Sequence, residues 1–135
     1  MSQMKVLQKM FNSKTLSGFV LGTYMALIFY VSSLPNETLV SVRFTVNNVL
    51  VYIVEYAILG FFMSRVATQL TDNVYAIFSS SFLFSLLYGV LDEIHQLFVP
   101  TRHCTIVDVY ADAVGSLAGV LLYLIVTKWM GRERS

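Results

Sequence analysis

The sequence predicts an all-α membrane protein, in which four transmembrane helices form one bundle and a single domain over residues 1–135. Hydrophobic residues make up 56% of the chain and charged residues 13%, and the mean hydropathy is +0.68. The apolar residues fall into four runs, each close to the ~20 residues that cross a hydrocarbon core as a helix. Lipid offers no partner for backbone amides, and four short spans cannot close a barrel, so the runs are expected to be helices.

Polar turns set the limits of each helix. Pro35 interrupts the first run because proline lacks an amide hydrogen. The polar stretch 69–73 separates the second run from the third, and the stretch 100–103 separates the third from the fourth. The helices are therefore expected at about residues 16–34, 49–67, 74–99 and 106–126.

The first run has a second interpretation as a signal peptide. Lys5, Lys9 and Lys14 precede it, and it ends in the small residues Ser32 and Ser33, which resemble a cleavage site. The run is long for that role, so we expect a retained helix.

The basic residues predict that both termini face the cytoplasm. Lysine and arginine are enriched in cytoplasmic loops. This orientation leaves only Arg43 and Arg102 outside, in two outward loops around residues 35–47 and 100–105. The residues it places inside are Lys5, Lys9, Lys14, Arg65, Lys128, Arg132 and Arg134.

Charge and cysteine content exclude several classes of partner. The formal net charge is +1 and no dense lysine or arginine cluster occurs, so a nucleic-acid partner is not expected. Cys104 is the only cysteine, so it forms no internal disulfide and no CxxC site. No cofactor is predicted.

Ionisable and amide side chains interrupt the third run near its outward end. Asp92, His95 and Gln96 stand at helical spacings of i, i+3 and i+4, and their stripe extends through Ser85. Glu93 projects about a quarter-turn away from that stripe. A charge near the bilayer interior costs at least ~2.5 kcal/mol on insertion scales, so these groups are expected to face protein rather than lipid.

The second and fourth helices bring further acids toward the same side. We expect the carboxyl groups to face one another, with His95 and Arg102 supplying positive charge and at least one acid holding a proton. The alternative is a buried network that only fixes helix register. The predicted binding residues are Glu55, Asp92, Glu93, His95, Gln96, Arg102, Asp108 and Asp112.

Three other features of the sequence bear on helix packing, catalysis and metal binding. Gly115 and Gly119 form a GxxxG spacing, whose expected use is close packing within the bundle, with a homodimer as the second possibility. Ser32 and Ser33 are expected to end the first helix rather than act as nucleophiles, because nothing in the sequence places a base beside them. One imidazole and several carboxylates could suit a divalent metal, but no diagnostic spacing occurs, so no metal site is predicted.

These motifs resemble those of the VanZ-like family over about residues 22–125. The run from Asp92 to Arg102, D-E-x-H-Q-x-F-V-P-x-R, carries most of the resemblance, supported by the segments 32–35, 55–60 and 108–115. The resemblance implies a small bacterial multipass protein whose founding relative is associated with low-level resistance to teicoplanin. The chain departs from the family pattern at Asn48, where an acid is usual, at Tyr52, where histidine is common, and at Asp112, where asparagine is frequent.

Three functions remain open at this stage. The favoured one is binding or shielding of a cell-envelope lipid or lipid-linked cell-wall intermediate in the bacterial cytoplasmic membrane, contributing to teicoplanin resistance. The second is a membrane-embedded hydrolase of a lipid-linked phosphate or ester, so enzymatic activity is left open. Its candidate catalytic residues are Asp92, Glu93, His95 and Asp108. The third, a proton-coupled carrier, is disfavoured because the inner half of each helix is nearly free of ionisable groups.

Overall fold

The computed structural model describes residues 13–43 and 48–132. Lys5, Lys9 and Arg134, three of the basic residues used for the orientation, lie outside the described residues. The side chains of Arg43, Asn48 and Arg132 also lie outside the described part.

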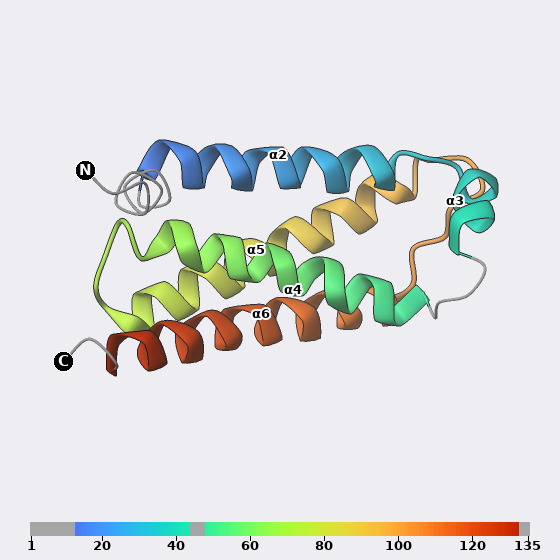
Figure 1. The fold of residues 1–135 in the computed structure, drawn as a ribbon. Coiled ribbons are helices and arrows are strands. Elements are labelled where there is room, and N and C mark those ends of the chain that lie inside the picture. Colours follow the sequence, from blue (N-terminus) through green and yellow to red (C-terminus); the bar gives the residue numbers. More distant parts are fainter. Residues whose placement is uncertain (1–12, 44–47, 133–135) are drawn as a thin grey trace.

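The described chain consists of helices, which confirms the predicted fold class. Four of them, α2, α4, α5 and α6, are long and apolar enough to cross a membrane. In chain order the helices are α2 (Lys14–Ser32), α3 (Asn36–Arg43), α4 (Asn48–Ala67), α5 (Val74–Gln96) and α6 (Ile106–Arg132) (Figure 1).

The long helices alternate in direction between two ends of the bundle (Figure 1). The terminal end holds the start of α2 and the end of α6, and the α3 end holds α3 and the segment 97–105. Helices α4 and α6 therefore run parallel to each other, and α5 crosses the bundle obliquely toward the last turn of α2. The two described ends of the chain lie at the same end of the bundle. That this end faces the cytoplasm stays a prediction.

Local chemistry explains where α2 begins and ends. Ser13 caps its first turn, because its hydroxyl accepts a hydrogen bond from the Leu16 amide at 3.5 Å. The helix ends at Ser32, two residues before the predicted limit, since the proline at position 35 disfavours helical geometry at Leu34.

The other helices also differ from their predicted limits. The loop 35–47 contains a two-turn helix, α3, that the sequence analysis did not anticipate. Helix α5 ends at Gln96 instead of residue 99, because Pro100 prevents a regular continuation and residues 97–99 form a tight i to i−3 turn instead. Helix α6 continues to Arg132, six residues beyond the predicted limit at 126.

Helices α4 and α6 pack with their backbones in contact. A methyl group at Gly115 would collide with the carbonyl oxygen of Ile53, and one at Gly119 would collide with that of Ala57. The GxxxG spacing therefore serves packing within the bundle, as expected. A homodimer through these two glycines stays a prediction, although both already face α4 of their own chain.

The bundle carries large apolar side chains on its outer surface, and its interior contains both apolar and polar residues. Large exposed apolar residues occur along every long helix, for example Phe19, Leu83 and Leu121. This distribution suits a lipid environment, where interhelical contacts are made by small and polar residues. The buried polar residues are Ser17, Ser32, Ser64, Ser81, Ser85, Asp92, Glu93, Gln96, Asp112 and Ser116.

Candidate functional site

A buried acid cluster lies near the α3 end, between α5 and α6, and consists of Asp92, Glu93 and Asp112 held together with Gln96. The Gln96 amide nitrogen donates to Asp92 Oδ2 at 3.0 Å and to Glu93 Oε1 at 3.3 Å. Glu93 and Asp112 are each only 1% exposed. Because one amide binds two carboxyl groups, Gln96 fixes the relative position of both acids on α5.

Asp112 faces this pair from α6 and packs on the backbone of α5. A Cβ placed at Gly89 would lie 3.0 Å from Asp112 Oδ2 and 3.1 Å from Tyr56 Cε1. Neither carboxyl oxygen of Asp112 has a hydrogen-bond partner within the described part of the chain. A buried ionised carboxylate without a partner is costly, so this group must be neutralised by a proton or by a bound donor.

Arg102 lies beside the cluster but bonds mainly to the end of α2. Its guanidinium donates to the carbonyl oxygens of Leu34 and Val31, each at 3.2 Å, and more weakly to that of Ser32 at 3.5 Å. It also donates to Tyr52 Oη at 3.3 Å. Arg102 therefore satisfies carbonyls that a helix C-terminus leaves free, so little of it remains available for a phosphate. Its charge still acts on Asp92 at a distance.

His95 faces α2 rather than the acid cluster. Its Nε2 lies 3.0 Å from the hydroxyl oxygen of Ser33, and its ring stacks on Phe29 at 4.5 Å. The Ser33 hydroxyl donates its single hydrogen to the Phe29 carbonyl oxygen at 2.7 Å, so in this arrangement His95 Nε2 is the donor to Ser33. The predicted stripe therefore divides, because Asp92 and Gln96 point inward while His95 points toward α2.

Asp108 makes its hydrogen bonds to Thr105 rather than to the buried acids, and it thereby caps α6. Its Oδ2 accepts from the Thr105 amide at 3.1 Å and from the Thr105 hydroxyl at 2.6 Å, while the Asp108 amide donates to Thr105 Oγ1 at 3.3 Å. This is a capping box, in which two side chains satisfy the first amides of a helix. The T-x-x-D spacing in the sequence was the signal for it.

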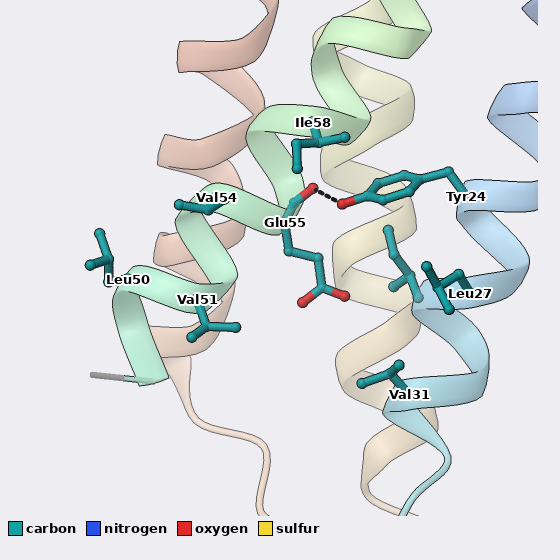
Figure 2. Close-up of a pocket in the computed structure, with 9 residues that line it drawn as sticks. Tyr24, Leu27, Val31, Leu50, Val51, Val54, Glu55 and Ile58 are labelled. Carbon is teal, nitrogen blue, oxygen red and sulfur yellow. Dashed lines mark hydrogen bonds between the residues drawn. The ribbon is translucent and has the colours of Figure 1, made fainter. Parts of the chain in front are cut away.

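Glu55 projects into a groove between α2 and α4 (Figure 2). The groove has a volume of about 490 Å³ and lies in the half of the bundle nearest the α3 end. The Tyr24 hydroxyl donates to the Glu55 carbonyl oxygen at 2.9 Å and links the two helices at the end of the groove farther from α3. The remaining lining residues are Leu27, Ile28, Val31, Leu50, Val51, Val54 and Ile58.

Cys104 stands in the segment between α5 and α6, close to the acids. Partial burial and the neighbouring carboxyl groups of Glu93 and Asp108 raise the pKa of its thiol to about 11. The thiol is therefore expected to react slowly at neutral pH. The adjacent His103 is exposed.

The predicted site residues thus fall into four groups. Asp92, Glu93, Gln96 and Asp112 form the buried cluster, Arg102 and Asp108 stabilise helix ends, His95 contacts Ser33, and Glu55 lines the groove. Among the residues that the structure describes, no three histidine, cysteine or acidic side chains converge as a metal-binding group.

Sequence reasoning missed two features of the site. It left Ser33 without a base, whereas His95 lies within hydrogen-bond distance of it from another helix. It also gave no role to Tyr56, whose ring packs beside Asp112 and whose hydroxyl has no partner in the described chain. No spacing within a single helix could have paired either residue with its neighbour.

Comparison with known proteins gives one match. The family model described as VanZ/LLP1 matches residues 3–127, nearly the whole chain. Neither the curated proteins nor the solved structures give a match.

Proposed function

The chain belongs to the VanZ/LLP1 family, and from this premise we propose that it binds a cell-envelope lipid or lipid-linked cell-wall intermediate and contributes to resistance to glycopeptides such as teicoplanin. Its place would be the bacterial cytoplasmic membrane. The observation that carries the proposal is the groove between α2 and α4.

The shape and lining of the groove suit a lipid tail. Its walls are almost entirely aliphatic, and Leu27, Leu50 and Val54 are each more than half exposed at the outer surface of the bundle. That surface faces lipid in a membrane, so a tail can enter sideways without crossing a polar surface. A volume of about 490 Å³ accommodates much of an acyl or isoprenoid chain.

Glu55 gives the groove a polar contact for the head of the ligand. Its carboxylate points between the two helices toward the α3 end, as Figure 2 shows. Tyr52 lies one turn of α4 nearer that end and accepts a hydrogen bond from Arg102. A carboxylate accepts hydrogen bonds and attracts cations, so the preferred ligand carries a hydroxyl or amine next to its tail.

A groove-filling substitution tests this proposal. Leu27→Trp places a large side chain in the groove, and Leu83→Trp is its matched control on the lipid-facing side of α5, where 60% of the leucine is exposed, against 53% at Leu27. In a susceptible Gram-positive host, wild type and the Leu83 variant should raise the teicoplanin concentration that inhibits growth, and the Leu27 variant should not.

Lipids that copurify with each variant identify the ligand class. Mass spectrometry should find a lipid bound to wild type and to the Leu83 variant at several times the amount bound to the Leu27 variant. Equal lipid content in both variants would contradict the groove as the binding site. A diacyl lipid and an isoprenoid-linked intermediate are distinguished by their masses.

A second candidate function is hydrolysis of a lipid ester, favoured by the contact between Ser33 and His95. Rotation of the Ser33 hydroxyl hydrogen from the Phe29 carbonyl to His95 Nε2, with the imidazole proton on Nδ1, would give a nucleophile and its base. Ser33 Oγ would then bond to the ester carbonyl carbon as its proton moves to Nε2. The lipid alcohol would leave with that proton, and water would hydrolyse the acyl-serine through the same histidine.

A fluorophosphonate probe, which modifies nucleophilic serines, tests this second function. Modification is expected at Ser33, and His95→Ala should reduce it at least tenfold, whereas Ser32→Ala serves as the neighbouring control and should leave it unchanged. Absence of modification, or equal modification without His95, would contradict the hydrolase and leave the lipid groove unaffected.

A further inference from the structure

We propose that a file of buried hydroxyl groups, formed by Ser81, Ser85 and Ser116, is a proton path that connects the acid cluster with the terminal end of the bundle. This inference is independent of the lipid groove, because none of these serines lines it. The transported species would be the proton itself, carried along hydroxyl groups and the water molecules that they bind.

The three serines are buried but do not make the bond that a helical serine usually makes. Ser85 and Ser116 are fully buried and Ser81 is 2% exposed, and none of the three hydroxyls has a partner within residues 13–43 and 48–132. Buried polar groups are normally hydrogen-bonded, and water is the commonest partner when protein supplies none.

Other serines of the bundle make the hydrogen bond that these three serines lack. Ser79 and Ser80 donate to carbonyl oxygens one turn earlier, at 2.8 and 2.6 Å, and Ser64 does the same on α4 at 2.9 Å. Such bonds back to the helix satisfy a hydroxyl in an apolar setting. Ser81 and Ser85 stand on the same helix as Ser79 and Ser80, yet neither of their hydroxyls makes such a bond within the described residues.

Helix register aligns these serines with the acid cluster. Gly89 of α5 and Asp112 of α6 face each other. The two helices run in opposite directions, so one turn nearer the terminal end the facing residues are Ser85 and Ser116. Another turn along α5 reaches Ser81. The file therefore begins at Asp112 and continues toward the terminal end.

Two hydrogen-bonded polar pairs lie farther toward the terminal end than Ser116. The hydroxyls of Thr68 and Tyr123 are hydrogen-bonded at 2.9 Å, and the Gln69 amide donates to Ser17 at 2.7 Å. Polar side chains thus extend through the part of the bundle where the sequence contains few ionisable groups. A scarcity of ionisable residues does not by itself prevent proton transfer there, because hydroxyl groups can both donate and accept and so relay protons.

Asp112 is the carboxyl group that would accept protons from the file. The titratable and charged groups that surround it are Glu55 and Tyr56 of α4, Asp92 and Glu93 of α5, and Asp108 of its own helix, with Arg102 acting on the α5 acids. One arginine cannot neutralise the three carboxyl groups of the acid cluster, so the cluster needs protons, and the file supplies a route for them.

Silver-ion modification of cysteine tests whether the file is hydrated and from which side. In a Cys104→Ser background, Ser85→Cys and Ser116→Cys are nearly isosteric probes, and Ser79→Cys is the matched control outside the file. Silver ions are added to one side of sealed vesicles whose orientation is known from the protease sensitivity of a C-terminal tag. After denaturation in detergent, free thiols are counted with a maleimide.

Silver ions added at the terminal side should protect Ser85→Cys and Ser116→Cys from maleimide at least tenfold more than Ser79→Cys. Full maleimide labelling of both probes would overturn the proposal, and so would protection only from the side of the α3 end. A second measurement is hydrogen–deuterium exchange of the Asp112 carboxyl, followed by its infrared band, which Asp112→Asn identifies. Ser85→Ala with Ser116→Ala should slow that exchange several-fold, and an unchanged rate would also overturn the path.

Discussion

Replacing Gly119 by alanine should destabilise the bundle, whereas the same change at Gly22 should not. Gly119 lies in the contact between α6 and α4, and an added methyl group would collide with the carbonyl oxygen of Ala57. Gly22 is exposed on α2, where a methyl group would meet nothing within 4 Å. Both glycines lie within membrane-spanning helices, so the pair isolates the effect of the helix contact.

The expected difference in the free energy of unfolding is about 3 kcal/mol. Overpacking a tight interior costs about 1–3 kcal/mol, and the upper end applies here because a backbone carbonyl cannot rotate away as a side chain can. Alanine stabilises a helix by about 1 kcal/mol relative to glycine, so the net loss of stability at position 119 is about 2 kcal/mol. At position 22 only the gain of about 1 kcal/mol remains.

Unfolding in mixed micelles measures this difference. The helical circular dichroism signal and the mobility of the protein are followed while the mole fraction of sodium dodecyl sulfate increases. The Gly119 variant should unfold at a lower fraction than wild type, and the Gly22 variant at the same or a higher fraction. Equal midpoints for the two variants would refute the close contact between α4 and α6 that positions Glu55 and Tyr56 relative to Asp112.

Three further predictions concern single contacts. Arg102→Ala should lower the unfolding free energy by about 2–4 kcal/mol, because it leaves the carbonyls at the end of α2 without a donor. Arg102→Lys should cause a smaller loss, because lysine replaces some of these hydrogen bonds. An unchanged melting temperature in the alanine variant would contradict this role. Tyr88→Phe should cost about 1 kcal/mol by removing the 2.6 Å bond to the Met25 carbonyl oxygen, measured by the same unfolding assay, whereas no loss would mean that the bond is absent. Glu93→Gln should lower the pKa of Cys104 from about 11 toward its ordinary value, because it removes a nearby negative charge. Iodoacetamide should then modify Cys104 several-fold faster in the variant than in wild type at pH 8.5. Equal rates would mean that Glu93 does not lie beside Cys104.

Much of the fold could be predicted because apolar runs and turn residues are local properties. The four spans lie near their expected positions, and their limits differ by a few residues where capping decides, as at Ser13 and Pro35. The helix α3 was missed because it is only eight residues long and forms no apolar run of membrane-spanning length. The sequence suggested a set of candidate site residues but could not give their arrangement. Helical spacing placed Asp92, His95 and Gln96 on one stripe, whereas α5 is enclosed by neighbours on two sides and divides the stripe between them.

Contacts between helices account for what the sequence could not reveal. Whether Arg102 binds a ligand or the end of α2 depends on how the segment 97–105 returns toward α2, and that path is set by tertiary packing. The pairing of Ser33 with His95 joins residues 62 positions apart. The capping role of Asp108 is local, since its partner is only three residues away, but Asp108 was predicted as a binding and candidate catalytic residue instead.

Photocrosslinking in living cells tests whether the groove between α2 and α4 holds a lipid. A photoreactive amino acid at Ile58, inside the groove, is compared with one at Leu83, on the lipid-facing side of α5. After irradiation, mass spectrometry of the purified protein should find one defined lipid class attached at position 58 and a mixture resembling bulk membrane at position 83. The same mixture at both positions would contradict a specific lipid site.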